Sequence, residues 1–401
     1  MRRLLTALAM LWLAGCQPNP AVLSAAEPST AAAPETPARI TPGAEQLAAY
    51  LPLLQGKRVG LLVNQTSRIG SEHLVDVLLA NNVNIVSIFA PEHGFRGDHD
   101  AGAKVSSGID SKTGIPLLSL YGASKAPSAA QMQALDLVIF DIQDVGVRYY
   151  TYISSMHYLM QAAAEHNVAM LVLDRPNPNG RYLDGPVLDL AFQSFVGMHP
   201  IPLLHGMTVG ELAMMIKGER WINQAEQLQL TVIPVANYQR DIAYSLPVPP
   251  SPNLPNDQAI ALYPSLGFFE ATPLSVGRGT AMPFQVLGYD KFSIGDFSFT
   301  PVATPGAAMN PPLKDTPSQG QDLSQVNAGG LDLSYLITWH NLFAANNVTF
   351  FSSPGFMDKL AGGDSLRQQI EQGLTEQQIR ASWQSALHEF AAKRQPYLLY
   401  P

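Results

Sequence analysis

Cysteine is almost absent from this chain of 401 residues, which holds a single one, Cys16. One cysteine excludes a disulfide framework within the chain and any cysteine-based metal site. Basic residues are also few, 24 Lys and Arg against 32 Asp and Glu, and they form no run longer than a pair. Because the net charge is −8 and no basic field is available to neutralise phosphates, we expect no nucleic-acid partner.

Several short motifs of common enzyme classes are missing as well. No strand-like segment is followed by G-x-G-x-x-G, and the P-loop pattern is absent, so nothing in the sequence indicates a bound nucleotide and we expect no cofactor. The G-x-S-x-G elbow is absent too, which removes the simplest serine-hydrolase interpretation. Beyond the first residues no stretch is long and apolar enough to form a transmembrane helix.

Residues 1–16 are typical of a secretory leader. The basic pair Arg2-Arg3 precedes the apolar run 4–13, which is too short to span a bilayer as a permanent helix. The tetrapeptide 13–16, Leu-Ala-Gly-Cys, resembles the lipobox of bacterial lipoproteins, which implies cleavage before Cys16 and lipidation of its thiol. An ordinary signal peptide with an incidental cysteine is the alternative. The resemblance implies an envelope protein at the periplasmic face, and Gln17 in place of aspartate favours the outer membrane by analogy with enteric bacteria.

Composition divides the remaining chain into three parts. Residues 17–42 are rich in Ala, Pro, Ser and Thr and predict a disordered tether. We expect a first domain over 43–245 and a smaller α/β (α+β) domain over 246–401, because six prolines between 247 and 264 mark a stiff irregular connection. Within the second domain, the Pro-, Gly- and Ser-rich stretch 301–330 predicts a long surface excursion.

The first domain alternates strand-like and helical segments. Short apolar runs at 58–64, 83–89, 117–121, 135–140 and 168–173 are of strand type, and helical periodicity lies between them at 72–81 and 151–167. This alternation predicts an α/β fold with a Rossmann-like, doubly wound parallel sheet covered on both faces. Capping boxes at Thr208 and Thr375 predict two further helices, and 228–236 suits an edge strand because it contains Pro234.

Carboxyl groups follow two of these strand-like runs. Glu92 comes directly after Pro91, and a carboxyl group at a partly buried strand end can have its pKa raised towards that of a general acid. Asp141 and Asp144 follow another run, and glycosidases hold two carboxyl groups about 5–5.5 Å apart for retention or about 6.5–9.5 Å for inversion. We therefore predict catalytic roles for all three. The alternative is that Asp141 only caps a helix or orients Arg148.

Other side chains of these polar loops suggest an anionic ligand. Arg96, Arg148, Arg175 and Arg278 lie beside glycine, proline or aromatic residues, and arginines that converge on one cleft bind carboxylates well, although each alone is more often a structural ion pair. Tyr149 to Tyr152 offer stacking faces or hydroxyl groups. His93, Asp98 and His99 resemble no standard zinc motif in their spacing, so we expect no metal.

Several long motifs resemble the bacterial exo-β-N-acetylmuramidase family. They include Ala90-Pro-Glu-His-Gly94, residues 140–153, Leu173-Asp-Arg-Pro-Asn-Pro178, His205-Gly-Met-Thr-Val-Gly-Glu-Leu212 and Ser275-Val-Gly-Arg-Gly-Thr280. The resemblance implies a Rossmann-like domain and a smaller C-terminal domain with the active site between them. It also implies removal of non-reducing-end N-acetylmuramic acid from peptidoglycan fragments such as muropeptides, with Glu92 as the catalytic glutamate and the lactyl carboxylate as the partner of the arginines.

The resulting prediction is a lipid-anchored glycosidase. Its expected substrate-binding residues are Asn64, Gln65, His93, Arg96, Gln143, Arg148, Tyr149, Tyr152, Arg175, Asn177 and Arg278. Two alternatives remain: a metal-dependent cell-wall hydrolase that uses His93, Asp98 and His99, and a peptidoglycan-binding lipoprotein without activity.

Overall fold

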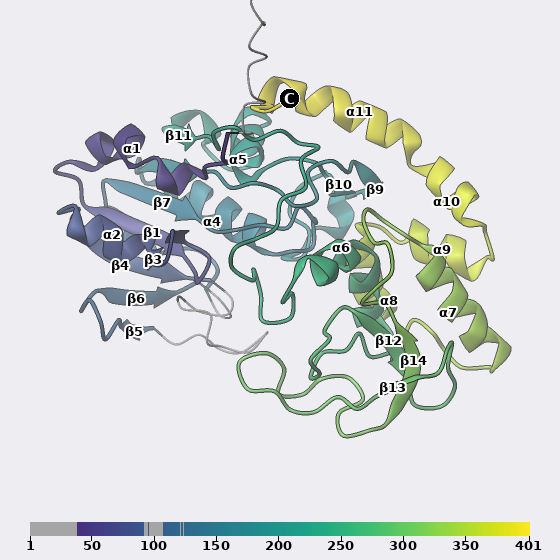
Figure 1. Cartoon of the computed structure of the whole chain (residues 1–401). Helices are drawn as coiled ribbons and strands as arrows, with labels where there is room; N and C mark the ends of the chain where they lie inside the picture. Colours follow the sequence, from purple (N-terminus) through teal and green to yellow (C-terminus); the bar gives the residue numbers. More distant parts are fainter. Residues whose placement is uncertain (1–37, 92–94, 96–106, 121, 123) are drawn as a thin grey trace, which may run out of the picture. The chain divides into compact units, whose positions relative to one another are not determined.

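A seven-stranded sheet organises the first half of the chain in the computed structural model, which describes residues 38–91, 95, 107–120, 122 and 124–401 (Figure 1). Its strands lie in the order β11-β8-β7-β1-β4-β6-β5. Their bounds are β1 Val59–Val63, β4 Ile85–Ala90, β5 Gly108–Ile109, β6 Pro116–Ser119, β7 Leu137–Asp141, β8 Ala169–Leu173 and β11 Leu230–Ile233. All neighbours are parallel except β5, which pairs antiparallel with β6. Numbered along the chain, the six parallel strands take the Rossmann order 3-2-1-4-5-6.

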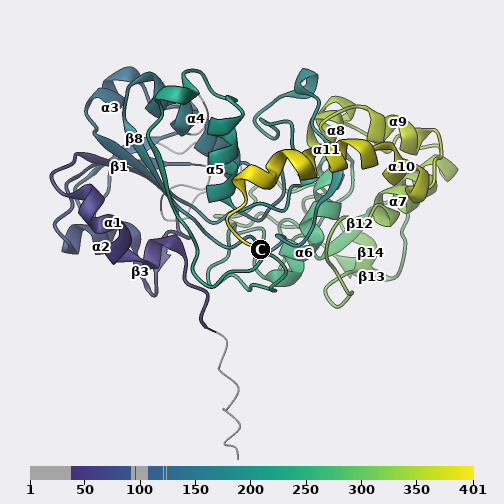
Figure 2. The same cartoon turned by 90° about the horizontal axis from the view of Figure 1, so that it is seen from above.

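Alternate residues of the central strands face two separate cores, as a sheet covered on both sides requires. On β7, Leu137 and Ile139 pack with helices α1 (Leu47–Leu54) and α2 (Leu74–Ala80). Val138 and Phe140 point the other way, into the core shared by α3 (Ala129–Gln133), α4 (Tyr152–Glu165) and α5 (Val209–Gly218). Figures 1 and 2 show these two groups of helices on opposite faces of the sheet, which is therefore doubly wound.

A smaller α+β part follows in the second half of the chain. Its antiparallel sheet has the order β12-β14-β13, formed by Val286–Tyr289, Ser318–Asp322 and Phe297–Phe299. Its helices are α6 Asp257–Leu266, α7 Ser334–Ala345, α8 Pro354–Ala361, α9 Ser365–Glu371, α10 Glu376–Ser382 and α11 Gln384–Arg394. The remaining short elements are β2 Arg68–Ile69, β3 Glu72–His73, β9 Asp184–Val187, β10 Pro202–Leu204 and the 3₁₀ turns Gly43–Glu45, Leu190–Phe192, Ala225–Gln227, Gly267–Ala271 and Gln395–Tyr397.

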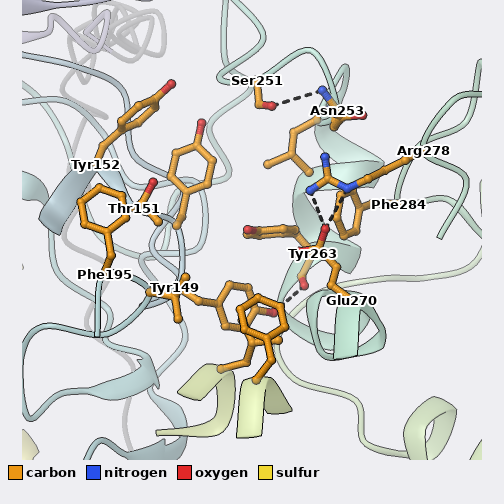
Figure 3. A pocket seen from close by; sticks show the side chains of 15 residues that line it. Tyr149, Thr151, Tyr152, Phe195, Ser251, Asn253, Tyr263, Glu270, Arg278 and Phe284 are labelled. Carbon is orange, nitrogen blue, oxygen red and sulfur yellow. Dashed lines mark hydrogen bonds and ion pairs between the residues drawn. The ribbon is translucent and has the colours of Figure 1, made fainter. Parts of the chain in front are cut away.

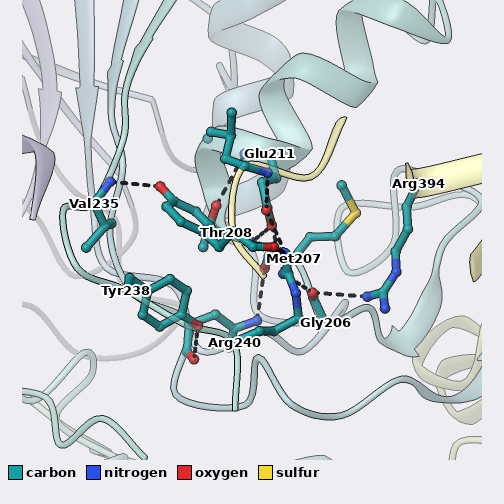
Figure 4. Close-up of polar contacts among 12 residues, drawn as sticks. Gly206, Met207, Thr208, Glu211, Val235, Tyr238, Arg240 and Arg394 are labelled. Carbon is teal, nitrogen blue, oxygen red and sulfur yellow. Dashed lines mark hydrogen bonds and ion pairs between the residues drawn. The ribbon is translucent and has the colours of Figure 1, made fainter. Parts of the chain in front are cut away.

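The last residues of the chain return to the large sheet through partly buried polar contacts (Figure 4). Arg394 donates to the carbonyls of His205 and Gly206, and the carboxylate of Glu211 accepts from Arg240 and from the backbone of Leu399. Glu211 also closes the capping box of α5 with Thr208. Through these partly buried contacts, the His205–Leu212 motif attaches the C-terminal segment to the large sheet.

Most of the predicted elements are confirmed. All five strand-like runs form parallel strands, the stretch 228–236 contains the edge strand β11, and both capping boxes begin helices. The prediction for 301–330 is wrong in part, because Ser318–Asp322 forms the central strand of the small sheet. Among the described residues, no helix is long and apolar enough to cross a membrane.

Candidate active site

The loops that follow β1 and β7 meet where the winding of the sheet changes direction, the position at which open α/β sheets bind ligands. Val63 pairs with Asp141 in the sheet register, so the two strands end side by side. Thr66 joins the loops: its hydroxyl accepts from the Gln143 amide at 3.0 Å and donates to Asn64 Oδ1 at 2.6 Å. We call this region the switch point.

Asp141 and Arg175 form a closed ion pair at this edge. The guanidinium Nε and Nη2 donate to the two carboxylate oxygens at 2.6 and 2.9 Å, and both side chains are buried. Although burial lowers the pKa of Arg175, attraction to Asp141 raises it above its ordinary value, so the guanidinium stays charged. Of the two roles considered for Asp141, this enclosure favours the structural one, and the arginine that it orients is Arg175.

Asp144 has a different environment. Its Oδ2 accepts from the Gly146 amide at 2.6 Å, while Oδ1 has no hydrogen-bond partner among the residues that the structure describes. Burial raises the pKa of this carboxyl to about 7. Hydrogen bonds from the backbone amides of Gly146 and Val145 lower the pKa, but by less than burial raises it. Gly146 has φ of 75°, and a Cβ there would meet the Asn177 side chain, so the tight turn that holds Asp144 requires glycine.

Arg148 is fully buried and donates to four backbone carbonyls. Its Nη1 contacts Pro186 and Ile201, and its Nη2 contacts Leu360 and Ala361 at the end of α8. Burial lowers the pKa of this guanidinium to about 9. The four contacts favour a structural role, in which Arg148 joins the large sheet to the smaller α+β part, over the predicted contact with substrate.

A pocket of about 200 Å³ is linked to the switch point through the carbonyl of Pro250. Figure 3 shows the side chains that line this pocket. The hydroxyl of Tyr150, which lines the pocket, donates to the Pro250 carbonyl at 2.7 Å. The side-chain amide of Gln65, at the switch point, donates to the same carbonyl at 3.1 Å. Most of its lining is aromatic or apolar: Tyr149, Tyr150, Tyr152, Phe195, Val196, Leu254, Tyr263, Phe284, Phe356 and Leu360. Its polar lining consists of Thr151, Ser251, Asn253, Glu270 and Arg278. Because drug-sized ligands occupy roughly 300–1,000 Å³, this space suits a smaller molecule such as one sugar ring.

The charged groups of this pocket are paired with each other. Arg278 Nε and Nη2 lie 2.8 and 2.6 Å from one oxygen of Glu270, and the guanidinium carbon lies 5.0 Å from the centre of the Phe284 ring. Figure 3 shows this pair on one side of the pocket and Tyr152 with Phe195 on the other. A cation opposite aromatic walls can bind an anionic group beside an apolar ring face.

The structure thus divides the predicted residues between two neighbouring places. The switch point holds Asn64, Gln65, Asp141, Gln143, Asp144, Arg175 and Asn177. The pocket holds Tyr149, Tyr152 and Arg278, although the Tyr149 hydroxyl is used by the Tyr263 and Pro264 carbonyls. Glu92, His93, Arg96, Asp98, His99 and Cys16 lie outside the described residues. In the part of the chain that is described, no group of three or more His, Cys, Asp and Glu side chains could hold a metal ion.

Ser251, Asn253 and Glu270 line the pocket but were not among the predicted site residues. The first two belong to a proline-rich stretch that the composition indicates only as a connection. Glu270 lies eight residues before Arg278, and the opposite charges of the two residues are the one signal that could have revealed the pair.

A Rossmann-type sheet with a small aromatic and charged pocket beside its switch point defines an α/β protein with a candidate ligand-binding site. Models of the exo-beta-N-acetylmuramidase NamZ family match most of the chain, the N-terminal model over residues 59–258 and the C-terminal model over 261–400. The chain belongs to this family and is a glycoside hydrolase.

Individual relatives agree with this assignment. The chain is 38% identical over 374 residues to the peptidoglycan beta-N-acetylmuramidase NamZ of Bacillus subtilis (strain 168), and the match covers 88% of this chain and 89% of the relative. Crystal structures of two DUF1343 family proteins from Bacteroides fragilis NCTC 9343 superpose with TM-scores of 0.82 and 0.78, at 47% and 29% identity. Each superposition covers 90% of this chain and 99% of the other.

Proposed function

We propose that this enzyme is an exo-acting glycosidase that releases N-acetylmuramic acid from the non-reducing ends of peptidoglycan fragments. The observation that carries the proposal is the pocket of about 200 Å³ in which Arg278 and Glu270 face aromatic walls. The aromatic rings offer a stacking surface for a pyranose, and the guanidinium offers a partner for the lactyl carboxylate that distinguishes muramic acid from glucosamine. The peptidoglycan beta-N-acetylmuramidase activity for which the Bacillus subtilis relative is named supports the same substrate class.

Glu92 is the proposed general acid. It follows Pro91, directly after β4, and β4 is the neighbour of β1 on the side opposite β7. An acid at this edge of the sheet would protonate the glycosidic oxygen as the bond to the anomeric carbon breaks, and this protonation lowers the barrier to departure of the aglycone.

The test compares wild type with Glu92→Gln on a chromogenic β-glycoside of N-acetylmuramic acid. Glutamine keeps the shape of the side chain but cannot donate a carboxyl proton, so we expect turnover to fall at least about 100-fold. The circular dichroism spectrum and the affinity for free N-acetylmuramic acid should be unchanged. Asp189→Asn, a carboxyl substitution on an exposed turn that does not line the pocket, serves as the control. A Glu92→Gln rate close to wild type would remove Glu92 from the mechanism.

A lipid anchor at the periplasmic face of the outer membrane is the second part of the proposal. It is supported by the Leu-Ala-Gly-Cys tetrapeptide at 13–16 and by Gln17. Expression of the whole chain in a Gram-negative host should place it in the outer-membrane fraction, and Cys16→Ala should release it from that fraction. Equal membrane recovery of both proteins would contradict the anchor.

A further inference from the structure

Among the described residues of the switch point, three buried polar side-chain atoms lack a hydrogen-bond partner: Oε1 of the partly buried Gln65, and, on two buried residues, Nδ2 of Asn64 and Oδ1 of Asp144. The side chains of Asn64 and Asp144 are 0% and 5% exposed. Each buried polar group left unsatisfied costs about 1–3 kcal/mol. Two of them on adjacent loops, at the edge of the sheet where such folds bind ligands, indicate a ligand that supplies the missing partners.

The unpaired atoms of Asn64 and Asp144 are fixed in direction because the other polar atom of each side chain is already bonded. Asn64 Oδ1 accepts from the Thr66 amide and from the Thr66 hydroxyl, at 2.9 and 2.6 Å. Asp144 Oδ2 accepts from the Gly146 amide at 2.6 Å. Each side chain therefore presents one unpaired atom in a set orientation, a donor on Asn64 and an acceptor on Asp144, and a ligand would not need to reorganise them.

The two loops are linked to each other and to the pocket. Thr66 bonds to the Gln143 amide at 3.0 Å, one residue before Asp144. On the pocket side, the Pro250 carbonyl accepts from both Gln65 and Tyr150, and Tyr150 lines the pocket. A sugar seated against the aromatic walls would thus have the switch point at one end.

We propose that Asn64 and Asp144 form a subsite for the 2-acetamido group of the sugar, with Asn64 Nδ2 donating to the acetamide carbonyl and Asp144 Oδ1 accepting from its N–H. A secondary amide has one carbonyl oxygen, which accepts a hydrogen bond, and one N–H, which donates one, so it pairs with one donor and one acceptor of the protein. A hydroxyl at C2 has no carbonyl oxygen and therefore cannot bond to both side chains in the same way. The identity of the sugar rests on the proposed function, whereas the complementarity to an acetamide depends only on the two unpaired atoms.

The electrostatics of the edge agree with an uncharged ligand group. Asp141 and Arg175 neutralise each other, and no other charged side chain among the described residues contributes to the raised pKa of Asp144, which is caused by burial. An N–H donor from the ligand would favour the ionised form of Asp144 and lower its pKa on binding.

Calorimetry with two sugars tests the subsite. N-acetylmuramic acid and 3-O-lactylglucose differ only at C2, where the second carries a hydroxyl. We expect wild type to bind N-acetylmuramic acid more tightly. Asp144→Asn turns the unpaired acceptor into a donor, and Asn64→Asp turns the unpaired donor into an acceptor. Each substitution should weaken binding of N-acetylmuramic acid at least about 10-fold, by the loss of one hydrogen bond, and leave 3-O-lactylglucose nearly unaffected.

Asp189→Asn is the matched control, because Asp189 also accepts from a backbone amide two residues on but lies on an exposed turn. It should bind both sugars like wild type. The subsite would be overturned if Asp144→Asn weakened the binding of both sugars to the same extent. It would also be overturned if wild type bound both sugars with equal affinity, or bound neither. A wild type that binds with the expected preference but releases no sugar would instead refute only the proposed function.

Proton release gives an independent readout of Asp144. Because burial raises the pKa of Asp144 to about 7, some of the Asp144 carboxyls are protonated at pH 7, so binding of N-acetylmuramic acid should release more protons from wild type than from Asp144→Asn. The release is measured from the dependence of the binding heat on the ionisation enthalpy of the buffer. Identical release from the two proteins would contradict the contact.

Discussion

Asp141→Asn separates a structural from a catalytic role for the carboxylate at the end of β7. In the part of the chain that the structure describes, the side chain of Arg175 has two short bonds to Asp141 and one further contact, of 3.5 Å, to the Arg68 carbonyl. An asparagine leaves the guanidinium charged, buried and without a counter-ion. Breaking a buried pair from one side costs about 3–5 kcal/mol, so the free energy of unfolding should fall by that amount.

Urea unfolding followed by tryptophan fluorescence measures this loss, and Asp136→Asn is the matched control. Asp136 also binds an arginine through two oxygens, Arg58 at 2.9 and 3.2 Å, but this pair lies at the surface. Exposed pairs contribute little, so the control should change the urea midpoint far less. Replacing both members, as Asp141→Leu with Arg175→Met, should cost less than Asp141→Asn because no unpaired charge remains.

The same variants report on catalysis. At a temperature where Asp141→Asn is folded, it should hydrolyse a chromogenic muramide with a kcat within a few-fold of wild type, because both carboxylate oxygens of Asp141 are engaged by Arg175. A variant as stable as Asp136→Asn would contradict the energetic argument. Complete loss of kcat in a folded, stable variant would restore Asp141 to the catalytic machinery.

Three further outcomes follow from the buried charges and the acid chemistry. Arg148→Lys should lower the free energy of unfolding by at least about 3 kcal/mol, because one ammonium cannot reach carbonyls on two elements; an unchanged urea midpoint would contradict this. Burial lowers the pKa of His157 to about 4, and the unfolded chain therefore takes up a proton that the folded one does not as the pH falls below about 6.5. Stability should fall by about 2 kcal/mol from this residue by pH 5, and His157→Gln should show a correspondingly smaller loss between pH 7 and pH 5. Activity should survive dialysis against EDTA, and its loss with recovery on adding Zn²⁺ would favour the metal-dependent alternative.

The large sheet could be predicted because its strands are continuous apolar runs separated by helical segments. Leu137–Phe140 is buried on both faces, and such runs are visible without any partner. The polar edge of the sheet was predictable for the same reason, since the residues after parallel strands must meet there. By contrast β14, Ser318–Asp322, is polar and contains glycine, so its place in the small sheet depends on pairing with β12 and β13.

The roles of the arginines could not be predicted from the sequence. Arg148 and Arg175 occupy similar polar loops, but one binds carbonyls up to 213 residues away and the other a carboxylate 34 residues away. Only the fold brings these partners together. Arg278 does line the pocket, and its partner Glu270 is close in sequence, yet nothing local shows that the two face an aromatic wall.

The central claim is tested most directly by mass analysis of the products from two disaccharides with opposite order. The enzyme should release free N-acetylmuramic acid from N-acetylmuramyl-β-1,4-N-acetylglucosamine and leave N-acetylglucosaminyl-β-1,4-N-acetylmuramic acid intact. Cleavage of the second disaccharide, or of neither, would contradict an exo-acting muramidase.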